Sequence, residues 1–130
     1  MAASTYAEVA EGVKATIARY THALDDGRTD DVVDTYCPDG VFDLPGTGTF
    51  EGHDALRAAY AKWAPRVPQR HLISNTLVSE WDDHQATATS DVVLLIQIDS
   101  AWKVQFVARY TDVLHHDDDG GWMFHRRTVA

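Results

Sequence analysis

The chain has 130 residues, 45% of them hydrophobic, and its formal net charge is -9. This length suits one hydrophobic core, so residues 1–130 are expected to form a single domain. The 11 Lys and Arg residues are scattered, and no apolar run reaches the ~20 residues of a membrane helix, so we expect the protein to bind neither nucleic acid nor membrane. The start of the chain lacks signal-peptide features, and Cys37 alone cannot form an internal disulfide, which together favour the cytoplasm.

Three helices are predicted in the first half of the chain. Thr5 and Glu8 have the spacing of a capping box, and apolar residues then recur at intervals of three and four. These apolar residues are Val9, Val13, Ile17, Tyr20 and Leu24. The pattern predicts an amphipathic helix that ends near Gly27. Shorter helices are expected over about 30–36 and over 54–64, and two prolines end the second of these helices.

Strands are predicted in the rest of the chain. CPDG (37–40) is expected to form a turn, followed by a short strand at VFDL (41–44). Residues rich in β-branched and aromatic side chains then predict four strands, over 70–81, 85–98, 102–115 and 122–129. The turns between these four are too short for anything but antiparallel neighbours. The sequence therefore predicts an α+β domain, with N-terminal helices on one face of a curved antiparallel sheet.

The order of these elements, together with several motifs, resembles the nuclear-transport-factor-2-like (NTF2-like) superfamily. Within it, the chain is similar to the SnoaL-like branch, which contains scytalone dehydratase, the bile-acid 7α-dehydratases and relatives of ketosteroid isomerase. The resembling segments are YTHALDDGRTDDVVDTYCPDGVFD (20–43), FEGHDAL (50–56), RHLISN (70–75), ARYTDV (108–113) and DGGWMFHRRTV (119–129). The resemblance implies a cone-shaped, cystatin-like fold around a deep apolar cavity. It also implies no cofactor, a small apolar ligand, and a homo-oligomer (dimer or trimer) paired through the outer face of the sheet.

The resemblance points to three catalytic residues. Tyr20 and Asp25 have the Tyr-x-x-x-x-Asp spacing of the bile-acid dehydratases, and His71 matches the histidine on the strand after the third helix. Scytalone dehydratase has a tyrosine at the place of Leu24, so this chain departs from its pattern. In the dehydratases of this branch, the matching side chains face the cavity.

Each of the three also has a structural interpretation. Asp25 stands in the last turn of its helix, where the macrodipole disfavours a carboxylate by ~0.3–1 kcal/mol, so it needs either a specific partner or water. An imidazole such as that of His71 can exchange protons at neutral pH, or can merely bond a backbone carbonyl at the rim of the sheet. Tyr20 lies on the apolar stripe, where a core role competes with the polarisation of a substrate oxygen.

Five further residues are predicted to contact the substrate. Strand alternation places Asn75 on the same face as His71, although a structural use of the amide is the alternative. Arg127 resembles an arginine common on the last strand of this branch, and it could equally be a rim charge or part of an ion pair. Tyr110 shares a strand face with Asp112, so the two face the cavity together or not at all. The full set is Asn75, Arg127, Tyr110, Phe42 and Trp63.

No metal site is expected. The segment HHDDDGGWMFH (115–125) contains several residues that bind metals, but consecutive ligands on a hairpin tip cannot converge on one ion, so a solvated turn is the better interpretation. No G-x-S-x-G, Walker or Rossmann pattern is present, which argues against serine hydrolase, NTPase and dinucleotide chemistry.

The sequence thus leads to a cofactor-independent lyase or isomerase, dehydratase-like, acting on a small apolar cyclic hydroxy- or keto-substrate. His71 would remove an acidic α-proton, Asp25 would orient and charge-balance His71, and Tyr20 would hydrogen-bond the oxygen that gains charge. The alternatives are a non-catalytic small-molecule-binding protein of the same fold and a polyketide-cyclase-like enzyme.

Overall fold

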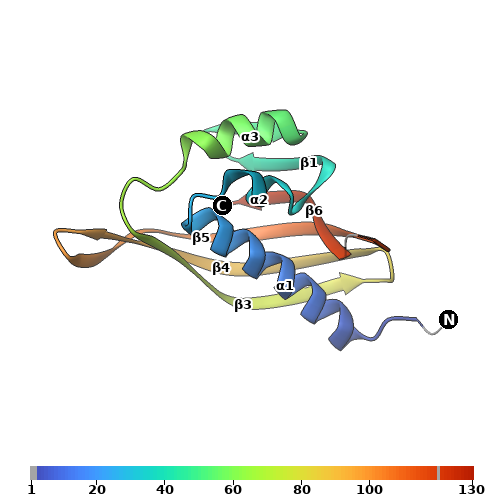
Figure 1. Ribbon diagram of the computed structural model, residues 1–130. Helices are drawn as coiled ribbons and strands as arrows, with labels where there is room; N and C mark the ends of the chain where they lie inside the picture. Colours follow the sequence, from blue (N-terminus) through green and yellow to red (C-terminus); the bar gives the residue numbers. More distant parts are fainter. Residues whose placement is uncertain (1–2, 120) are drawn as a thin grey trace.

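The computed structural model describes residues 3–119 and 121–130, so the first two residues and Gly120 of the expected DDDGG turn lie outside the described part. The elements in chain order are α1 (Tyr6–Asp25), α2 (Thr29–Val33), β1 (Tyr36–Leu44), β2 (Gly48–Glu51), α3 (His53–Lys62), β3 (Gln69–Trp81), β4 (Gln85–Ile98), β5 (Ala101–Asp117) and β6 (Gly121–Val129). In Figure 1, α1 lies across β3, β4 and β6, while α3 lies over β1 and β2. The predicted α+β architecture, with helices on one face of a curved sheet, is confirmed.

The strands form a six-stranded sheet in the order β2-β1-β6-β5-β4-β3. β3 to β6 form the predicted antiparallel meander, whereas β1 pairs with β6 in parallel, a contact between strands that are far apart in the sequence. The prediction of a turn at CPDG is wrong, because β1 runs through it. Five steps along β1, from Tyr36 to Val41, face two steps along β6, from Phe124 to Arg126. This irregularity accommodates the Pro and Gly that indicated a turn.

α1 begins and ends where its sequence signals predict. The Thr5 side chain accepts a hydrogen bond from the Glu8 amide (3.2 Å), and the Glu8 carboxylate accepts one from the Thr5 amide (2.9 Å). Just beyond the other end, Gly27 has φ +73°, a conformation that favours glycine and directs the chain away from the helix. Asp25 is therefore the last helical residue, and its side chain reaches across to β3.

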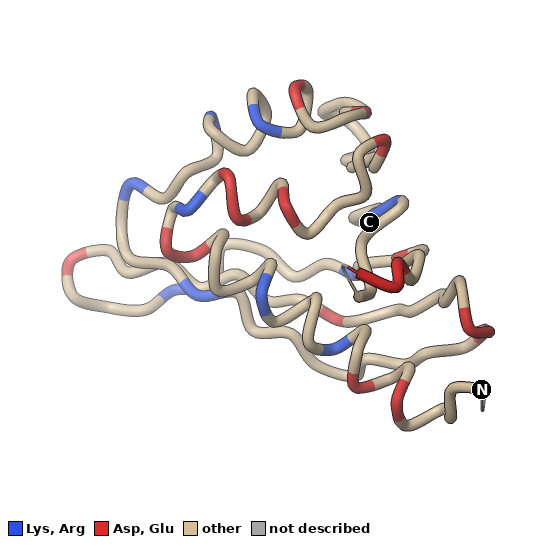
Figure 2. Tube along the Cα trace, turned by 45° about the vertical axis from the view of Figure 1, so that its right-hand side comes forward, with Lys and Arg blue, Asp and Glu red and all other residues tan. Residues whose placement is uncertain are grey.

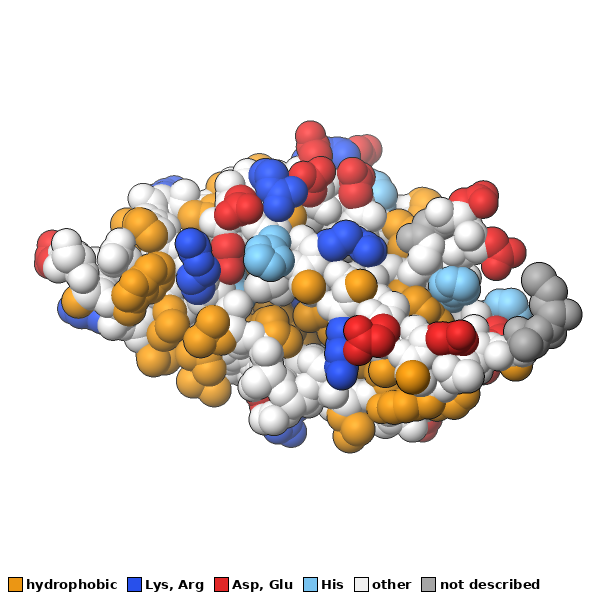
Figure 3. All heavy atoms as spheres, turned by 60° about the horizontal axis from the view of Figure 1, so that its bottom comes forward, with side chains coloured by type: hydrophobic (Ala, Val, Ile, Leu, Met, Phe, Trp, Pro, Cys, Tyr) orange, Lys and Arg blue, Asp and Glu red, His pale blue; other side chains and the backbone are white. Residues whose placement is uncertain are grey.

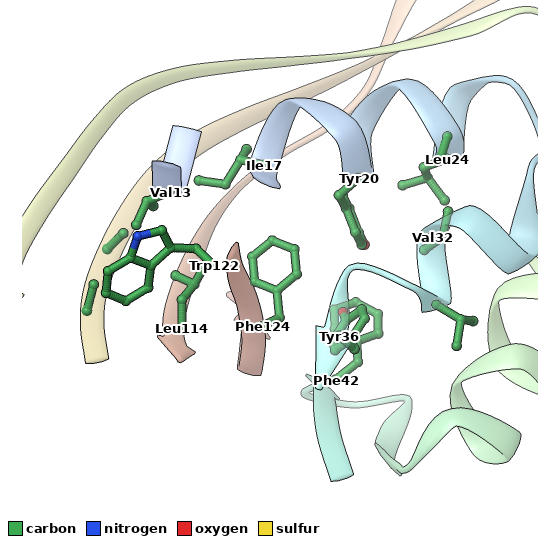
Figure 4. Close-up of a cluster of buried hydrophobic side chains, with 14 of the residues drawn as sticks. Val13, Ile17, Tyr20, Leu24, Val32, Tyr36, Phe42, Leu114, Trp122 and Phe124 are labelled. Carbon is green, nitrogen blue, oxygen red and sulfur yellow. The ribbon is translucent and has the colours of Figure 1, made fainter. Parts of the chain in front are cut away.

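The aromatic part of the core lies between α1, β1 and β6. The Tyr20 ring centroid is 5.5 Å from that of Phe124 and 6.3 Å from that of Tyr36, both in edge-to-face arrangements. Figure 4 shows Tyr20 pointing from α1 toward these side chains. Such pairs contribute about 0.5–1.5 kcal/mol beyond the burial of their area. Tyr20 is 1% exposed, so the core role that its place on the apolar stripe indicated is present.

The surface carries charges over most of the molecule and one region rich in apolar side chains. Figure 2 shows Lys and Arg interspersed with Asp and Glu along the helices. Hydrophobic side chains gather instead around the β4–β5 hairpin, at the left of Figures 1 and 3, where Trp102 is 47%, Val104 61% and Val107 71% exposed. No helix within residues 3–119 and 121–130 is long and apolar enough to span a membrane.

Candidate active site

A cavity of about 340 Å³ lies between the C-terminal end of α1, the end of α3 and the sheet. This volume is at the small end of the range for ligand pockets, which is about 300–1,000 Å³. Most of its wall is aliphatic or aromatic. Five of the predicted site residues line it: Tyr20, Phe42, Trp63, His71 and Tyr110. These five residues come from α1, β1, the C-terminal end of α3, β3 and β5, and they face one space.

Asp25 and His71 form a hydrogen-bonded pair at the wall of this cavity. His71 Nδ1 lies 2.6 Å from Asp25 Oδ1, and the His71 backbone amide donates to Oδ2 at 2.8 Å. The side chains of His71 and Asp25 are only 8% and 7% exposed. Because an ionised carboxylate can only accept, the neutral imidazole carries its hydrogen on Nδ1 and leaves a lone pair on Nε2. A base is thus held at the cavity wall with one orientation and one tautomer.

The position of Asp25 at the end of a helix is compensated by these donors. Burial, the largest influence, by itself raises the pKa of a carboxyl group. Hydrogen bonds from the His71 side chain and backbone, together with the attraction of His71 and a bond from Gln69, outweigh it, so the pKa of Asp25 is lowered. The carboxylate is therefore ionised at neutral pH, and it can balance the charge of an imidazolium.

Gln69 is a site residue that our reading of the sequence missed. Its Nε2 donates to Asp25 Oδ1 at 3.1 Å, so three hydrogen bonds converge on this carboxylate. Gln69 also lines the cavity and is 8% exposed. The signal was available, because Gln69 stands two residues before His71 and so occupies the same face of β3.

Three tyrosine hydroxyls form a chain beside the cavity. The Tyr60 hydroxyl lies 2.7 Å from the hydroxyl of Tyr20 and 2.7 Å from that of Tyr36. Tyr20 and Tyr60 line the cavity, whereas Tyr36 stands behind them and is fully buried. Tyr60 lies within the third predicted helix, over 54–64, and no role in the site was predicted for it. Burial raises the pKa of all three phenols, so they stay neutral and keep their hydrogens.

The hydrogen bonds among the three tyrosine hydroxyls leave one hydroxyl hydrogen unused. Three hydroxyls carry three hydrogens, and the two hydrogen bonds between them use two. One O–H group is left over to donate outside the chain. Because Tyr20 and Tyr60 face the cavity, that donor can meet a ligand oxygen there.

The comparisons with known proteins show the family and the fold. A model of the SnoaL-like domain family matches residues 5–128. The chain belongs to the SnoaL-like domain family. This family includes isomerases, dehydratases and cyclases. No curated protein sequence matches this SnoaL-like chain.

Solved structures similar to this SnoaL-like chain share its fold. A protein from Catenulispora acidiphila in complex with S-DNPA is 28% identical, with 95% of this chain and 92% of that chain covered and a TM-score of 0.85. Rv3472, a function unknown protein from Mycobacterium tuberculosis, is 27% identical, with 92% and 69% covered and a TM-score of 0.84. ActVI-ORFA from Streptomyces coelicolor is 22% identical, with 92% and 94% covered and a TM-score of 0.82, which shows a shared fold alone.

Arg127 does not line the cavity of this SnoaL-like chain, contrary to the expectation that it touches the substrate. It is completely buried and forms two hydrogen bonds with Asp112, at 2.9 and 3.2 Å. Its guanidinium carbon lies 3.5 Å from the ring centroid of Tyr110 and 4.4 Å from that of Tyr20. Arg127 therefore supports the cavity wall from behind, and the ion-pair alternative describes it.

Asn75 points away from the cavity, so its predicted place beside His71 is wrong. It has φ 55°, and the pairing of β3 with β4 shifts register around it. This bulge interrupts the alternation of faces on which the prediction relied. The Asn75 amide instead donates to Asp91 (2.8 Å), which also accepts from Arg109 (2.8 Å) on the outer face of the sheet.

The histidines near the β5–β6 turn do not assemble into an evident metal centre. Within residues 3–119 and 121–130, no three His, Cys, Asp or Glu side chains converge as metal ligands would. His115 and His125 instead stack, with ring centroids 4.1 Å apart, and His116 packs on Trp122.

Proposed function

We propose that this SnoaL-like protein is a cofactor-independent lyase or isomerase, dehydratase-like, that acts on a small apolar cyclic hydroxy- or keto-substrate. The observation that carries the proposal is the 2.6 Å contact between His71 Nδ1 and Asp25 Oδ1 at the wall of an apolar cavity. A buried carboxylate that fixes one imidazole nitrogen leaves the other as a base, which is the arrangement of general acid–base catalysis.

The reaction begins with proton abstraction. His71 Nε2 takes a proton from the carbon next to a carbonyl group, and the electrons of the C–H bond move toward the carbonyl oxygen. Asp25 balances the charge of the imidazolium, and Tyr20 donates a hydrogen bond to the oxygen that becomes negative. The weakly hydrated surroundings strengthen both interactions relative to water.

The imidazolium then returns its proton. If the β-carbon carries a hydroxyl group, the proton goes to the leaving oxygen, and the products are a carbon–carbon double bond and water. If the substrate is instead a β,γ-unsaturated ketone, the proton goes to the γ-carbon of the dienolate, and the double bond moves into conjugation with the carbonyl group. The same groups serve both outcomes, so the substrate decides between dehydration and isomerisation.

Proton abstraction can be measured without knowledge of the natural substrate. We expect the protein to accelerate the exchange of α-hydrogens of 2-tetralone, an uncharged bicyclic ketone, for deuterium in D₂O, followed by NMR. His71→Ala should lower this rate by about 10²–10⁴-fold, while calorimetric binding of 2-tetralone persists. His84→Ala, which changes an exposed histidine on the β3–β4 turn, is the matched control.

Two results would decide against an enzyme. If 2-tetralone binds and exchanges no faster than in buffer, or if His71→Ala exchanges as fast as the unchanged protein, the non-catalytic binding protein is the better description. The complex of the Catenulispora acidiphila relative with S-DNPA supports ligand binding by this fold and leaves that alternative in place.

We also propose a homo-oligomer, a dimer or trimer that pairs through the outer face of the sheet. The apolar residues exposed there, such as Leu77 at 57% and Val107 at 71%, support this arrangement. Light scattering coupled to size-exclusion chromatography would test it, and Val107→Asp should shift the mass toward the monomer. The single-domain organisation of residues 1–130 and the cytoplasmic location stay predictions.

A further inference from the structure

The NH₂ group and the carbonyl oxygen of the Gln69 side chain face different parts of the site. It is 8% exposed, and it lies on the same face of β3 as His71. Its Nε2 donates to Asp25 Oδ1 at 3.1 Å, beside the bond from His71 Nδ1 to the same oxygen. The side chain therefore touches the carboxylate that orients the base and, as a lining residue, the space that receives the ligand.

The chemistry of Asp25 fixes which way the amide faces. An ionised carboxylate has no hydrogen to donate, so Gln69 must turn its NH₂ group toward Asp25 and its carbonyl oxygen, Oε1, away from it. Oε1 has no hydrogen-bond partner among the described residues. The buried side-chain atoms that lack a partner there are His125 Nδ1 and Arg127 Nη1, and Oε1 is not among them. The oxygen is therefore accessible, and the cavity is the space that Gln69 lines.

The remaining polar groups of the cavity define what Oε1 can bind. Tyr20, Tyr60 and Tyr110 supply hydroxyl groups, His71 supplies an imidazole, and Gln105 adds a second amide. No Lys, Arg, Asp or Glu side chain is among the lining residues within the described chain. A carboxylate or phosphate would lose its hydration without meeting a fixed cation, which is costly. An uncharged ligand with a hydroxyl hydrogen fits both the acceptor and the lack of charge.

We propose that Gln69 is a positioning and specificity residue, whose Nε2 holds Asp25 in place while Oε1 accepts a hydrogen bond from a hydroxyl group of an uncharged polycyclic substrate. The positioning half rests on the proposed function, because it concerns the base that this function requires. The specificity half concerns binding alone. At an interior packing density of about 0.74, a cavity of about 340 Å³ holds a molecule of ~250 Å³, about the size of two or three fused six-membered rings.

Specificity is tested by a comparison of paired ligands by calorimetry. The probes are dihydroxynaphthalene isomers and their monomethyl ethers, in which a methyl group replaces one hydroxyl hydrogen. For at least one isomer, the unchanged protein should bind the diol about five- to tenfold more tightly than the ether. Gln69→Met should reduce that ratio to about one, while Gln97→Met, a change to a glutamine of β4 that is not among the residues lining the cavity, keeps it. The proposal is overturned if the ratio survives in Gln69→Met, or if no isomer discriminates.

A second pair of probes tests whether the cavity prefers an uncharged ligand. 2-Naphthol and 2-naphthoate have the same ring system, and only the second is an anion at pH 7. We expect 2-naphthol to bind at least about tenfold more tightly. Equal or tighter binding of 2-naphthoate would refute an uncharged substrate.

Positioning is tested at Asp25 itself. Removal of the Gln69 donor should raise the pKa of Asp25, and Gln69→Glu should raise it further, because a second carboxylate then faces the first. The measurement is the ¹³C chemical shift of the Asp25 carboxyl group against pH, with the circular dichroism spectrum as the check on folding. An unchanged titration in both folded variants would remove the positioning role.

The two proposals fail in different ways. If the unchanged protein catalyses no exchange of 2-tetralone hydrogens, the enzyme proposal falls, but the dependence of diol binding on Gln69 can still hold. If exchange depends on His71 while Gln69→Met keeps the diol preference, the enzyme stands and the role of Gln69 falls.

Discussion

Two buried carboxylates each pair with a basic side chain in this protein, and they differ in what lies next to the pair. Asp112 and Arg127 are both completely sealed, with two hydrogen bonds between them and aromatic rings against the guanidinium. Asp25 and His71 are almost as well covered, but His71 lines the cavity. Burial and pairing are therefore common to both sites.

The difference lies in access and in the proton. A guanidinium stays protonated in proteins, and Arg127 reaches no cavity, so the pair with Asp112 can only hold the structure together. An imidazole gains and loses its proton near neutral pH, and His71 keeps Nε2 available. Burial and charge alone therefore do not distinguish the two pairs. The pair of Asp25 and His71 differs because an imidazole can exchange a proton and because His71 lines the cavity.

The largest expected effect concerns the sealed pair. Arg127→Met leaves the Asp112 carboxylate buried without a partner, so we expect a loss of about 3–5 kcal/mol in the free energy of unfolding, measured in urea. The matched control is Arg109→Met, which breaks an ion pair with Asp91 whose arginine is 64% exposed and should cost less than about 1 kcal/mol. Equal losses in the two variants would contradict a structural role for the buried pair.

The next effect concerns the pair at the cavity. Asp25→Asn keeps the shape of the side chain but removes the charge that balances an imidazolium, so the exchange rate of 2-tetralone should fall about 100-fold. Folding should survive, because the change leaves no unpaired ion behind. The rate is measured by NMR in D₂O, with the thermal midpoint of unfolding as the check on structure. An exchange rate equal to that of the unchanged protein, together with a lowered thermal midpoint, would show that Asp25 serves the fold and not the site.

The tyrosine chain lies against Arg127 of the sealed pair through the Tyr20 ring, and Tyr20 and Tyr60 also line the cavity. Its expected effect is smaller. Tyr60→Phe removes the shared partner of the Tyr20 and Tyr36 hydroxyls, which should cost about 1–3 kcal/mol of stability, because buried hydroxyls are left without a partner. Tyr36→Phe removes only one hydrogen bond and should cost about 0.5–1.5 kcal/mol. Denaturation in urea measures both. If Tyr36→Phe costs as much as Tyr60→Phe, the hydroxyls do not form a chain with Tyr60 at its centre.

The sequence predicted the features that depend on local periodicity. α1 and the meander β3–β6 follow from regular spacing of apolar residues and from short turns, and both are confirmed. The contact between Asp25 and His71 came from a resemblance, because residues 46 positions apart in the chain have no shared local signal. The same is true of the parallel pairing of β1 with β6.

The errors fall where the periodicity is interrupted or where two charges meet. One inserted residue in β3 turns Asn75 to the outer face, and alternation cannot reveal such a bulge in advance. Arg127 has the chemistry of a substrate ligand, and only the three-dimensional position of Asp112 shows that its charge is already used. Gln69 has the correct alternation, but it stands one residue before the predicted strand of 70–81, and a neutral amide has no acid–base chemistry that would single it out.

The smallest effect, and the most direct comparison of protonation with structure, is the pH dependence of stability. Since the pKa of Asp25 is lowered in the folded protein, the unfolded chain binds more protons between the folded and unfolded pKa values, and stability rises with pH in that window. Asp25 thus stabilises the fold above its ordinary pKa of 3.8, and this contribution is lost as the pH falls through the lower, folded value. The difference in unfolding free energy between the unchanged protein and Asp25→Asn should therefore shrink as the pH falls below about 4. A difference that stays constant down to pH 2 would show that the carboxylate charge of Asp25 gives the fold nothing, and that its hydrogen bonds serve the site alone.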